Sequence, residues 1–287
     1  MFASPLILLL GSYFGAYHPL GDSLAVFRGP LTIAGALSIL GLARAGFKGA
    51  VGLAGVLVLG SAYTVLAPRV GWSAAPNAPY ALYQKNMRFK MPSTGGLRDD
   101  ILAQNPDFIT LQEVSRQNRP LLADLKTPYP AQVFCPFATV GGVAVASRWP
   151  MVAGSERCQP ASGMAAMQLE TPDGPVWLVS LHLHWPYPKG QAAQVRLLLP
   201  QLAELKGPVV LGGDFNMVPW AHTLRAITAA THTRRIGVPH YTLSLKGIYS
   251  LPIDHVLVHS NDRPASSQKR PLLGSDHDGV LARFSIR

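Results

Sequence analysis

Carboxylate, amide and imidazole side chains follow short apolar runs in the second half of the chain. The most informative run covers residues 208–216, where an apolar segment ends in two glycines and then presents Asp214 and Asn216. A second run places Asp276 beside His277 immediately before another apolar segment. Loops at strand ends are a usual place for catalytic groups in α/β folds. Each run alone also fits a turn, because Asp and Asn side chains commonly bond to nearby backbone.

Four other polar residues interrupt apolar runs that have the length of β-strands. Glu113 and Asp254 each lie in or at the end of such a run, and His182 and His184 would share one face of a sheet. A buried acid is costly unless it is paired or bound to a metal. A paired core residue is the simpler explanation for any one of them, but several strands that each carry such a group indicate a site.

Six short motifs occur in order along the chain and resemble the endonuclease/exonuclease/phosphatase superfamily, which includes pancreatic-type deoxyribonucleases, abasic-site endonucleases, inositol polyphosphate phosphatases and neutral sphingomyelinases. G-D-x-N and S-D-H with an upstream Q-E form a fairly specific combination, whereas either alone would be weak. The similarity covers residues 80–286 and implies a DNase I-like α/β fold, a two-sheet sandwich flanked by helices. The motifs are N-M-R at Asn86, L-Q-E-V at Glu113, S-L-H-L at His182, G-D-F-N at Asp214, I-D-H-V at Asp254 and S-D-H at Asp276.

The resemblance implies a divalent-metal-dependent phosphoester hydrolase of the nuclease or phosphatase type. It makes Glu113 a ligand of Mg²⁺ or Mn²⁺, with Asn86 and Asp276 close to the metal. Hard oxygen donors suit such an ion, and no cluster in the sequence suggests zinc.

The resemblance also assigns the residues around the phosphate. Asp214 would orient or deprotonate the attacking water, and Asn216 would donate to a phosphoryl oxygen as charge builds. His277, held by Asp254, would face the phosphate or act as the base, and His182 would contact the phosphate or assist the leaving group. Whether Asp214 or His277 takes the proton is left open by the sequence.

Two positions depart from the family's pattern. Leu181 stands where Thr is common in the histidine motif, and His184 is a rival for His182, although the strand context favours His182. Arg88 stands where some relatives carry an acid, so a second metal ligand is absent there.

The elements that must position these residues are short apolar runs alternating with amphipathic stretches. This mixture favours a two-sheet sandwich over a strictly parallel βαβ fold. Strands are predicted at 80–87, 107–114, 142–147, 176–183, 209–213 and 253–258, with a closing strand after Gly279. Helices are predicted at 97–104, 115–125, 191–205 and 221–229, with Ser115 as the N-cap of the second.

The first 76 residues differ in composition from the rest. They hold four of the 25 basic residues and one of the 15 acids, and segments 1–21 and 49–68 carry no charge. Both segments are close to the roughly 20 residues that cross a bilayer as a helix, and 29–43 is a shorter third span or an interfacial segment. We therefore predict an integral membrane region at 1–67 with two or three transmembrane helices in the lipid bilayer. A Pro- and Gly-rich linker at 68–79 and the enzyme domain at 80–287 follow.

Charge does not determine which side of the membrane the enzyme domain faces. With three spans, Arg44 and Lys48 on one side are matched by Arg28 and Arg69 on the other.

Two cysteines bear on the compartment. Cys135 and Cys158 flank a predicted hairpin around residues 147–150, where paired strands could bring them within disulfide reach. A disulfide would indicate an oxidising compartment, and on this basis the domain is predicted to be extracytoplasmic (periplasmic). Two buried free cysteines are an equally good alternative.

The enzyme domain carries 21 of the basic residues and 14 of the acids. This surplus fits a nucleic acid, a phospholipid head group, a small phosphoester or an anionic bilayer surface, without choosing among them. Scattered basic residues, Lys85 and Arg235 among them, are interpreted as an ordinary solvated surface. The alternative function is a catalytically inactive membrane-tethered binding module, against which the presence of all six motifs argues. No protein partner is predicted.

Overall fold

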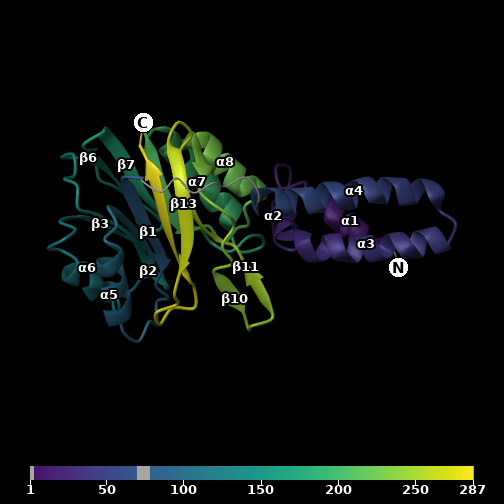
Figure 1. Ribbon diagram of the computed structural model, residues 1–287, viewed down its shortest axis with the longest axis horizontal. Coiled ribbons are helices and arrows are strands. Elements are labelled where there is room, and N and C mark those ends of the chain that lie inside the picture. The colour runs from purple at the N-terminus through teal and green to yellow at the C-terminus, as the bar shows by residue number, and fades with distance from the viewer. Residues whose placement is uncertain (1–2, 70–77, 287) are drawn as a thin grey trace.

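Residues 80–286 form a sandwich of two six-stranded mixed sheets (Figure 1). The computed structural model describes residues 3–69 and 78–286. The first sheet has the order β13 (Arg263–Arg270), β14 (Gly279–Ser285), β1 (Tyr80–Asn86), β2 (Phe108–Val114), β4 (Gly141–Ser147), β3 (Ala131–Ala138). The second has the order β5 (Arg157–Cys158), β6 (Met164–Thr171), β7 (Gly174–His182), β8 (Val209–Asp214), β12 (Asp254–His259), β9 (Thr233–Arg235).

Helices cover the outer face of each sheet. α5 (Gly95–Gln104) and α6 (Pro120–Asp124) pack on the first sheet, and α7 (Gln191–Ala203) and α8 (His222–Ala230) pack on the second. A third apolar cluster fills the space between the sheets. Every position of β1 is buried because both of its faces are covered, so its polar residues Gln84, Lys85 and Asn86 lie inside the protein together with its apolar ones.

The strand register brings distant motifs to one edge of the sandwich. The parallel pair β1–β2 sets Asn86 opposite Gln112, and the parallel pair β7–β8 sets His182 opposite Asp214. The antiparallel strand β12 starts at this same edge, with Asp254 opposite Asp214. The ends of these strands therefore carry polar groups from both sheets to a common place.

The predicted strands and helices are found, with one change in a helix start. The helix expected at 115–125 begins only at Pro120, because the Ser115 hydroxyl accepts hydrogen bonds from the amides of Gln117 and Asn118 and so closes a local turn. Short or edge strands were not predicted, among them β3, β5 and the separate hairpin β10 (Leu243–Leu245) and β11 (Tyr249–Leu251). β5, β10 and β11 have only two or three residues, which is too short to give a clear period. β3 contains Pro136, which lowers the strand signal of an edge strand.

The two cysteines form a disulfide, but not across the predicted hairpin. Cys135 lies on β3 and Cys158 on β5, and their Cα atoms are 5.3 Å apart. These strands are edge strands of different sheets. The bond therefore ties the two layers of the sandwich together at one side.

The N-terminal region differs from the predicted two or three spans. It consists of α1 (Ser4–Gly11), α2 (Pro19–Val26), α3 (Arg28–Arg44), α4 (Lys48–Leu66) and a 3-10 turn, η1 (Ala67–Arg69). The expected span over 1–21 is interrupted, because α1 ends at Gly11 and a new helix starts at Pro19. Lys48–Arg69 is the one described helix long and apolar enough to cross a membrane by itself; α2 with α3 passes only as a pair bent by 78°. α3 and α4 project from the sandwich as a helical hairpin (Figure 1).

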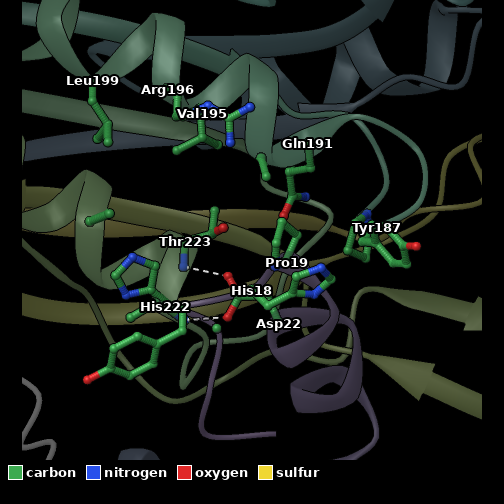
Figure 2. Close-up of a pocket in the computed structure, with 16 residues that line it drawn as sticks. His18, Pro19, Asp22, Tyr187, Gln191, Val195, Arg196, Leu199, His222 and Thr223 are labelled. Carbon is green, nitrogen blue, oxygen red and sulfur yellow. Dashed lines mark hydrogen bonds between the residues drawn. The ribbon is translucent and has the colours of Figure 1, made fainter. Parts of the chain in front are cut away.

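The segment between α1 and α3 is docked onto the enzyme domain (Figure 2). Asp22 lies 200 residues before His222 in the sequence, yet it accepts hydrogen bonds from the backbone amides of His222 and Thr223 at 2.7 and 2.8 Å. These are the first amides of α8, so Asp22 caps that helix from another part of the chain. Ala25 and Val26 join the apolar cluster beneath α7 and α8. Of the predicted linker at 68–79, residues 70–77 lie outside the described residues.

Candidate active site

Most of the residues named by the motifs line one pocket of about 480 Å³ at the common strand edge. Asp254 and Asn86 stand directly behind it and contact residues that line it. The structure thus brings together groups spread over almost two hundred residues. The predicted residues that line the pocket are Glu113, His182, Asp214, Asn216, Asp276 and His277.

The carboxylate of Asp214 is the centre of this arrangement. Its Oδ2 lies 3.7 Å from Nε2 of His182 and 3.9 Å from Nε2 of His277. The amide of Asn86 donates to the same oxygen at 2.9 Å. Oδ1 accepts the backbone N–H of Asn216 at 2.9 Å. One carboxylate oxygen therefore faces both imidazoles while the other is fixed by the turn that follows β8.

Asp254 holds His277 from behind, as the motif resemblance implied. Its Oδ2 is 2.8 Å from Nδ1 of His277, which leaves Nε2 of the ring directed at the pocket. Gln84 donates to the other oxygen of Asp254 at 2.8 Å, and the Thr242 hydroxyl also donates to Oδ2. Asp214, Asp254 and His277 form a buried cluster tight enough to hold a cation. Because Asp254 is already bonded to the ring, we assign this pair to orienting the imidazole.

Burial and mutual charge set the protonation of this cluster. Burial, and then the nearby Asp254 carboxylate, raise the pKa of Asp214 to about 7. Burial lowers the pKa of His277, but the carboxylates of Asp254 and Asp214 outweigh it and raise that pKa to about 10. Burial and the charge of His277 lower the pKa of His182 to about 3. Near neutral pH the site therefore combines a charged imidazole, a neutral imidazole and a carboxylate poised to exchange a proton.

The predicted metal ligands Glu113 and Asp276 line the same pocket as Asp214 and the two histidines. Glu113 accepts from the Phe89 amide at 2.8 Å and from the Asn86 side chain at 3.2 Å, and burial raises its pKa. Asp276 is half exposed and lies 3.9 Å from Arg88. Two carboxylates open to one pocket provide the hard oxygen donors that Mg²⁺ or Mn²⁺ prefers, so the donor set fits such an ion.

Two amides differ in detail from what the motifs imply. The oxygen of Asn86 accepts the Arg88 amide at 2.9 Å while its nitrogen holds Glu113 and Asp214, so Asn86 positions the carboxylates and does not turn an oxygen toward the pocket. The nitrogen of Asn216 donates to the Leu183 carbonyl at 2.8 Å, which leaves one of its two N–H groups for another acceptor.

His182 and His184 both line the pocket, but they differ in surroundings. His182 ends β7, is 5% exposed and faces Asp214. The backbone of His184 is held by Gln194 and Gln191, and its ring packs on Phe137 at 4.8 Å between centroids. His182 is therefore the imidazole that contacts the charged centre.

Several supporting residues were missed in the sequence. Lys85 is fully buried, and its Nζ donates to the carbonyls of Pro271, Leu272 and His277, so it fixes the loop that carries His277. Its interpretation as a solvated surface residue is wrong, and the same holds for Arg235, which is largely buried and donates to the Pro68 carbonyl. The sequence offered one signal for Lys85: it lies within a predicted strand, where a buried charge needs hydrogen-bond partners.

Backbone conformation also sets this edge apart. Glu113, Asn216 and Arg88 all have positive φ, at 55°, 46° and 60°. Such conformations cost free energy for residues with a side chain, and they persist where the surrounding structure imposes them, commonly at functional sites. The turn at Glu113 directs its carboxylate toward the pocket and away from the strand.

Comparison with known proteins agrees with this geometry. The sequence matches the Endonuclease/Exonuclease/phosphatase family over residues 84–277. No curated protein sequence matches the chain. Among solved structures, an endonuclease/exonuclease/phosphatase from Beutenbergia cavernae is 18% identical, with a TM-score of 0.59 and coverage of 73% of this chain and 72% of that one.

Two further solved structures have the same fold. A humanized D. rerio TDP2 is 16% identical, with a TM-score of 0.58 and coverage of 71% of this chain and 98% of that one. The human Nocturnin catalytic domain with a bound sulfate anion is 18% identical, with a TM-score of 0.57 and coverage of 73% and 95%. At these identities the likeness establishes the DNase I-like sandwich and not a shared substrate.

Proposed function

The chain belongs to the endonuclease/exonuclease/phosphatase family, and we propose that it is a membrane-anchored phosphoester hydrolase that uses the pocket around Asp214. The family and the fold make it a metal-dependent phosphoesterase. The finer assignment rests on one observation above all. A single buried carboxylate faces two imidazoles, one of which is backed by a second carboxylate.

In this proposal Asp214 is the base that orients the attacking water and takes its proton. A pKa of about 7 is near the value at which a base is both available and effective at neutral pH. His277, kept protonated by Asp254 and Asp214, donates from Nε2 to a phosphoryl oxygen where negative charge builds. In this proposal Asp214, and not His277, takes the proton of the water. The neutral His182 and the second N–H of Asn216 add contacts to the phosphate.

Glu113 and Asp276 would hold the divalent ion. The side-chain amide of Asn86 donates to the carboxylates of both Glu113 and Asp214 and so fixes their relative position. Such an ion supplies charge neutralisation for the phosphate. Among the described residues, Arg88 is the one ion-pair partner of these two carboxylates, at 3.9 Å from Asp276, and the charged His277 imidazole also acts on both. The proximity of two carboxylates that open to one pocket is what supports a cation at this place.

The anchoring part of the proposal is supported by the N-terminal helices. Lys48–Arg69 has 22 residues, which spans about 33 Å as a helix, and its most apolar window is only 11% buried in the protein. Its outward face carries exposed Leu53, Val56, Leu59 and Tyr63. With α3 beside it, both ends of the hairpin return to the enzyme domain, so the domain would lie on one side of the membrane.

The disulfide supports an extracytoplasmic, periplasmic domain. Disulfides persist in oxidising compartments and are rare in reducing ones. The tip of the α3–α4 hairpin, with Arg44 and Lys48, would then face the cytoplasm. Arg28 and Arg69 at the other end of the hairpin balance these charges, so the disulfide alone supports this orientation.

A substrate panel tests the proposed function. The full chain is needed, because Ala25 and Val26 are part of the apolar core and a fragment from Tyr80 would expose it. Detergent-solubilised protein is assayed on plasmid DNA, bis-nitrophenyl phosphate, sphingomyelin and phosphoinositides, each with Mg²⁺, Mn²⁺ or EDTA. We expect hydrolysis of at least one phosphoester that EDTA abolishes. Turnover that resists EDTA, or a folded chain inactive on every substrate, contradicts the proposal and favours an inactive binding module.

A further inference from the structure

An apolar groove of about 450 Å³ lies where the α3–α4 hairpin meets the enzyme domain. Its walls come from three directions. Ile33 on α3 and Leu66 on α4 form the membrane-side walls, and Trp220 and Tyr249 from the domain form the floor. Its volume lies within the roughly 300–1,000 Å³ typical of small-molecule sites.

The lining offers hydrocarbon and almost no free polar groups. The Trp220 indole N–H donates to the Ala25 carbonyl at 2.8 Å, and the Tyr249 hydroxyl donates to the Val26 carbonyl at 2.9 Å. The polar atoms of these aromatic residues are therefore satisfied within the protein, and their rings face the groove. A ligand there gains from apolar burial and not from hydrogen bonds.

The groove is continuous with the face of the helices that would contact lipid. Ile33 and Leu66 line it and are still 68% and 53% exposed, which is costly in water but not in a bilayer. Tyr241 and Tyr249 at the domain end have the amphipathic character that places aromatic residues at the membrane interface. An apolar chain could therefore enter sideways from the bilayer without crossing water.

One cation marks the end of the groove nearest the domain. Arg69 follows the last turn of α4, lies 5.1 Å from the Tyr241 ring centroid and donates to its hydroxyl. Within residues 3–69 and 78–286, Arg69 has no carboxylate at ion-pair distance. An arginine at the end of an apolar helix lies at the level of lipid phosphates, which it can bind.

From these observations we propose that the groove binds one acyl chain of a bilayer phospholipid whose phosphate pairs with Arg69. The proposal rests on the membrane anchoring proposed above. The β10–β11 hairpin separates this lipid from the catalytic pocket, because Leu243 and Leu245 of β10 line the catalytic pocket and Tyr249 of β11 lines the groove. The bound lipid is therefore a structural ligand at the junction and not the substrate.

The test uses quenching of Trp220 by phosphatidylglycerol with dibrominated acyl chains, titrated into the detergent-solubilised full chain. Subtracting the signal of Trp220→Phe isolates this indole. We expect saturable quenching that Ala62→Leu and Gly29→Leu abolish, because both positions line the groove and a Cβ on Gly29 meets open space. The matched controls Ala50→Leu and Gly60→Leu lie on α4 outside the groove. In these variants the lipid should quench Trp220 as it does in the unmodified chain.

The phosphate contact is tested in the same titration. Arg69→Gln should shift half-maximal quenching to severalfold higher lipid, whereas Lys48→Gln, at the far end of α4, should not. Quenching that is absent, or that survives both groove-filling variants, overturns the proposal. So does hydrolysis of the quenching lipid by the enzyme, since the ligand would then be substrate. Release of the chain from membranes by alkaline carbonate would instead refute the anchoring, independently of the groove.

Discussion

Two buried aspartates, one in the N-terminal helical region and one in the candidate active site, have opposite surroundings. Asp22 on α2 is 6% exposed, and both of its oxygens accept backbone N–H groups of α8. Asp214 at the catalytic edge is 1% exposed, and one of its oxygens faces two imidazoles beyond ordinary hydrogen-bond distance. Both carboxylate oxygens of Asp22 therefore have hydrogen-bond donors, whereas Asp214 lies near two imidazoles and the carboxylate of Asp254.

The difference indicates what each carboxylate does. A buried acid with complete hydrogen bonding stabilises the structure around it, because its charge is matched by fixed dipoles. A buried acid without complete hydrogen bonding keeps an affinity for a proton, and burial, followed by the neighbouring Asp254 carboxylate, raises the pKa of Asp214 to about 7. Removing the first should therefore cost stability, and removing the second should cost activity.

The largest expected effect is on turnover at the catalytic edge. Asp214→Ala or His277→Ala should lower kcat by about 10²–10⁴-fold, since each removes a group that acts on the transition state. The double variant should be little worse than the poorer single one, because the two act as a unit. Steady-state kinetics with circular dichroism as a folding control measures this. Near-normal turnover in folded Asp214→Ala would show that Asp214, like Asp22, is not needed for activity.

The next effect concerns the metal requirement. Glu113→Gln keeps the shape of the side chain but removes its charge, so the Mg²⁺ or Mn²⁺ concentration for half-maximal activity should rise by roughly 10–100-fold. Gln168, on the far end of the second sheet, offers a control through Gln168→Glu, which should leave that concentration unchanged. An unchanged metal requirement in Glu113→Gln would show that the ion is held elsewhere.

A pH effect follows from His277 in metal-free protein. Its folded pKa is raised to about 10 from an ordinary 6.5, so its contribution to stability is complete below about 6.5 and is lost as pH rises toward 10. In EDTA, the Tm of the unmodified chain should fall more steeply between pH 7.5 and 10 than that of His277→Gln. Differential scanning fluorimetry is the measurement. Parallel curves would mean that the two carboxylates do not hold a proton on His277.

The smallest effect is at the junction. Asp22→Ala leaves two buried amides of α8 without an acceptor and should lower the free energy of unfolding by about 0.5–2 kcal/mol, the usual cost of losing a helix cap. Turnover per folded molecule should not change, because Asp22 lies outside the catalytic pocket. Ser23→Ala, which removes only an exposed bond to the Tyr187 carbonyl, is the control and should have little effect. Lost turnover with unchanged stability in Asp22→Ala would reverse the comparison.

The sequence by itself determined the family and pointed to residues that the structure brings to one pocket. Motifs such as G-D-F-N and S-D-H are local, and the chemistry of their side chains limits what they can do. The strands that carry them were also predictable, because β1 and β8 each begin with a short apolar run, Tyr80–Tyr83 in β1 and Val209–Leu211 in β8. For the same local reason the sequence predicted a membrane helix over the segment that became α4.

Only the tertiary structure decided how distant segments meet. It paired Cys135 with Cys158 across two sheets, buried Lys85 beneath the His277 loop, broke the first predicted span at Gly11 and docked Asp22 onto α8. Each of these depends on contacts between residues far apart in the chain, which leave no periodic signal. The residue type of a lysine or an aspartate does not reveal whether the side chain is exposed or buried. Its surroundings in the folded protein set its hydrogen bonds, its charge and therefore its role.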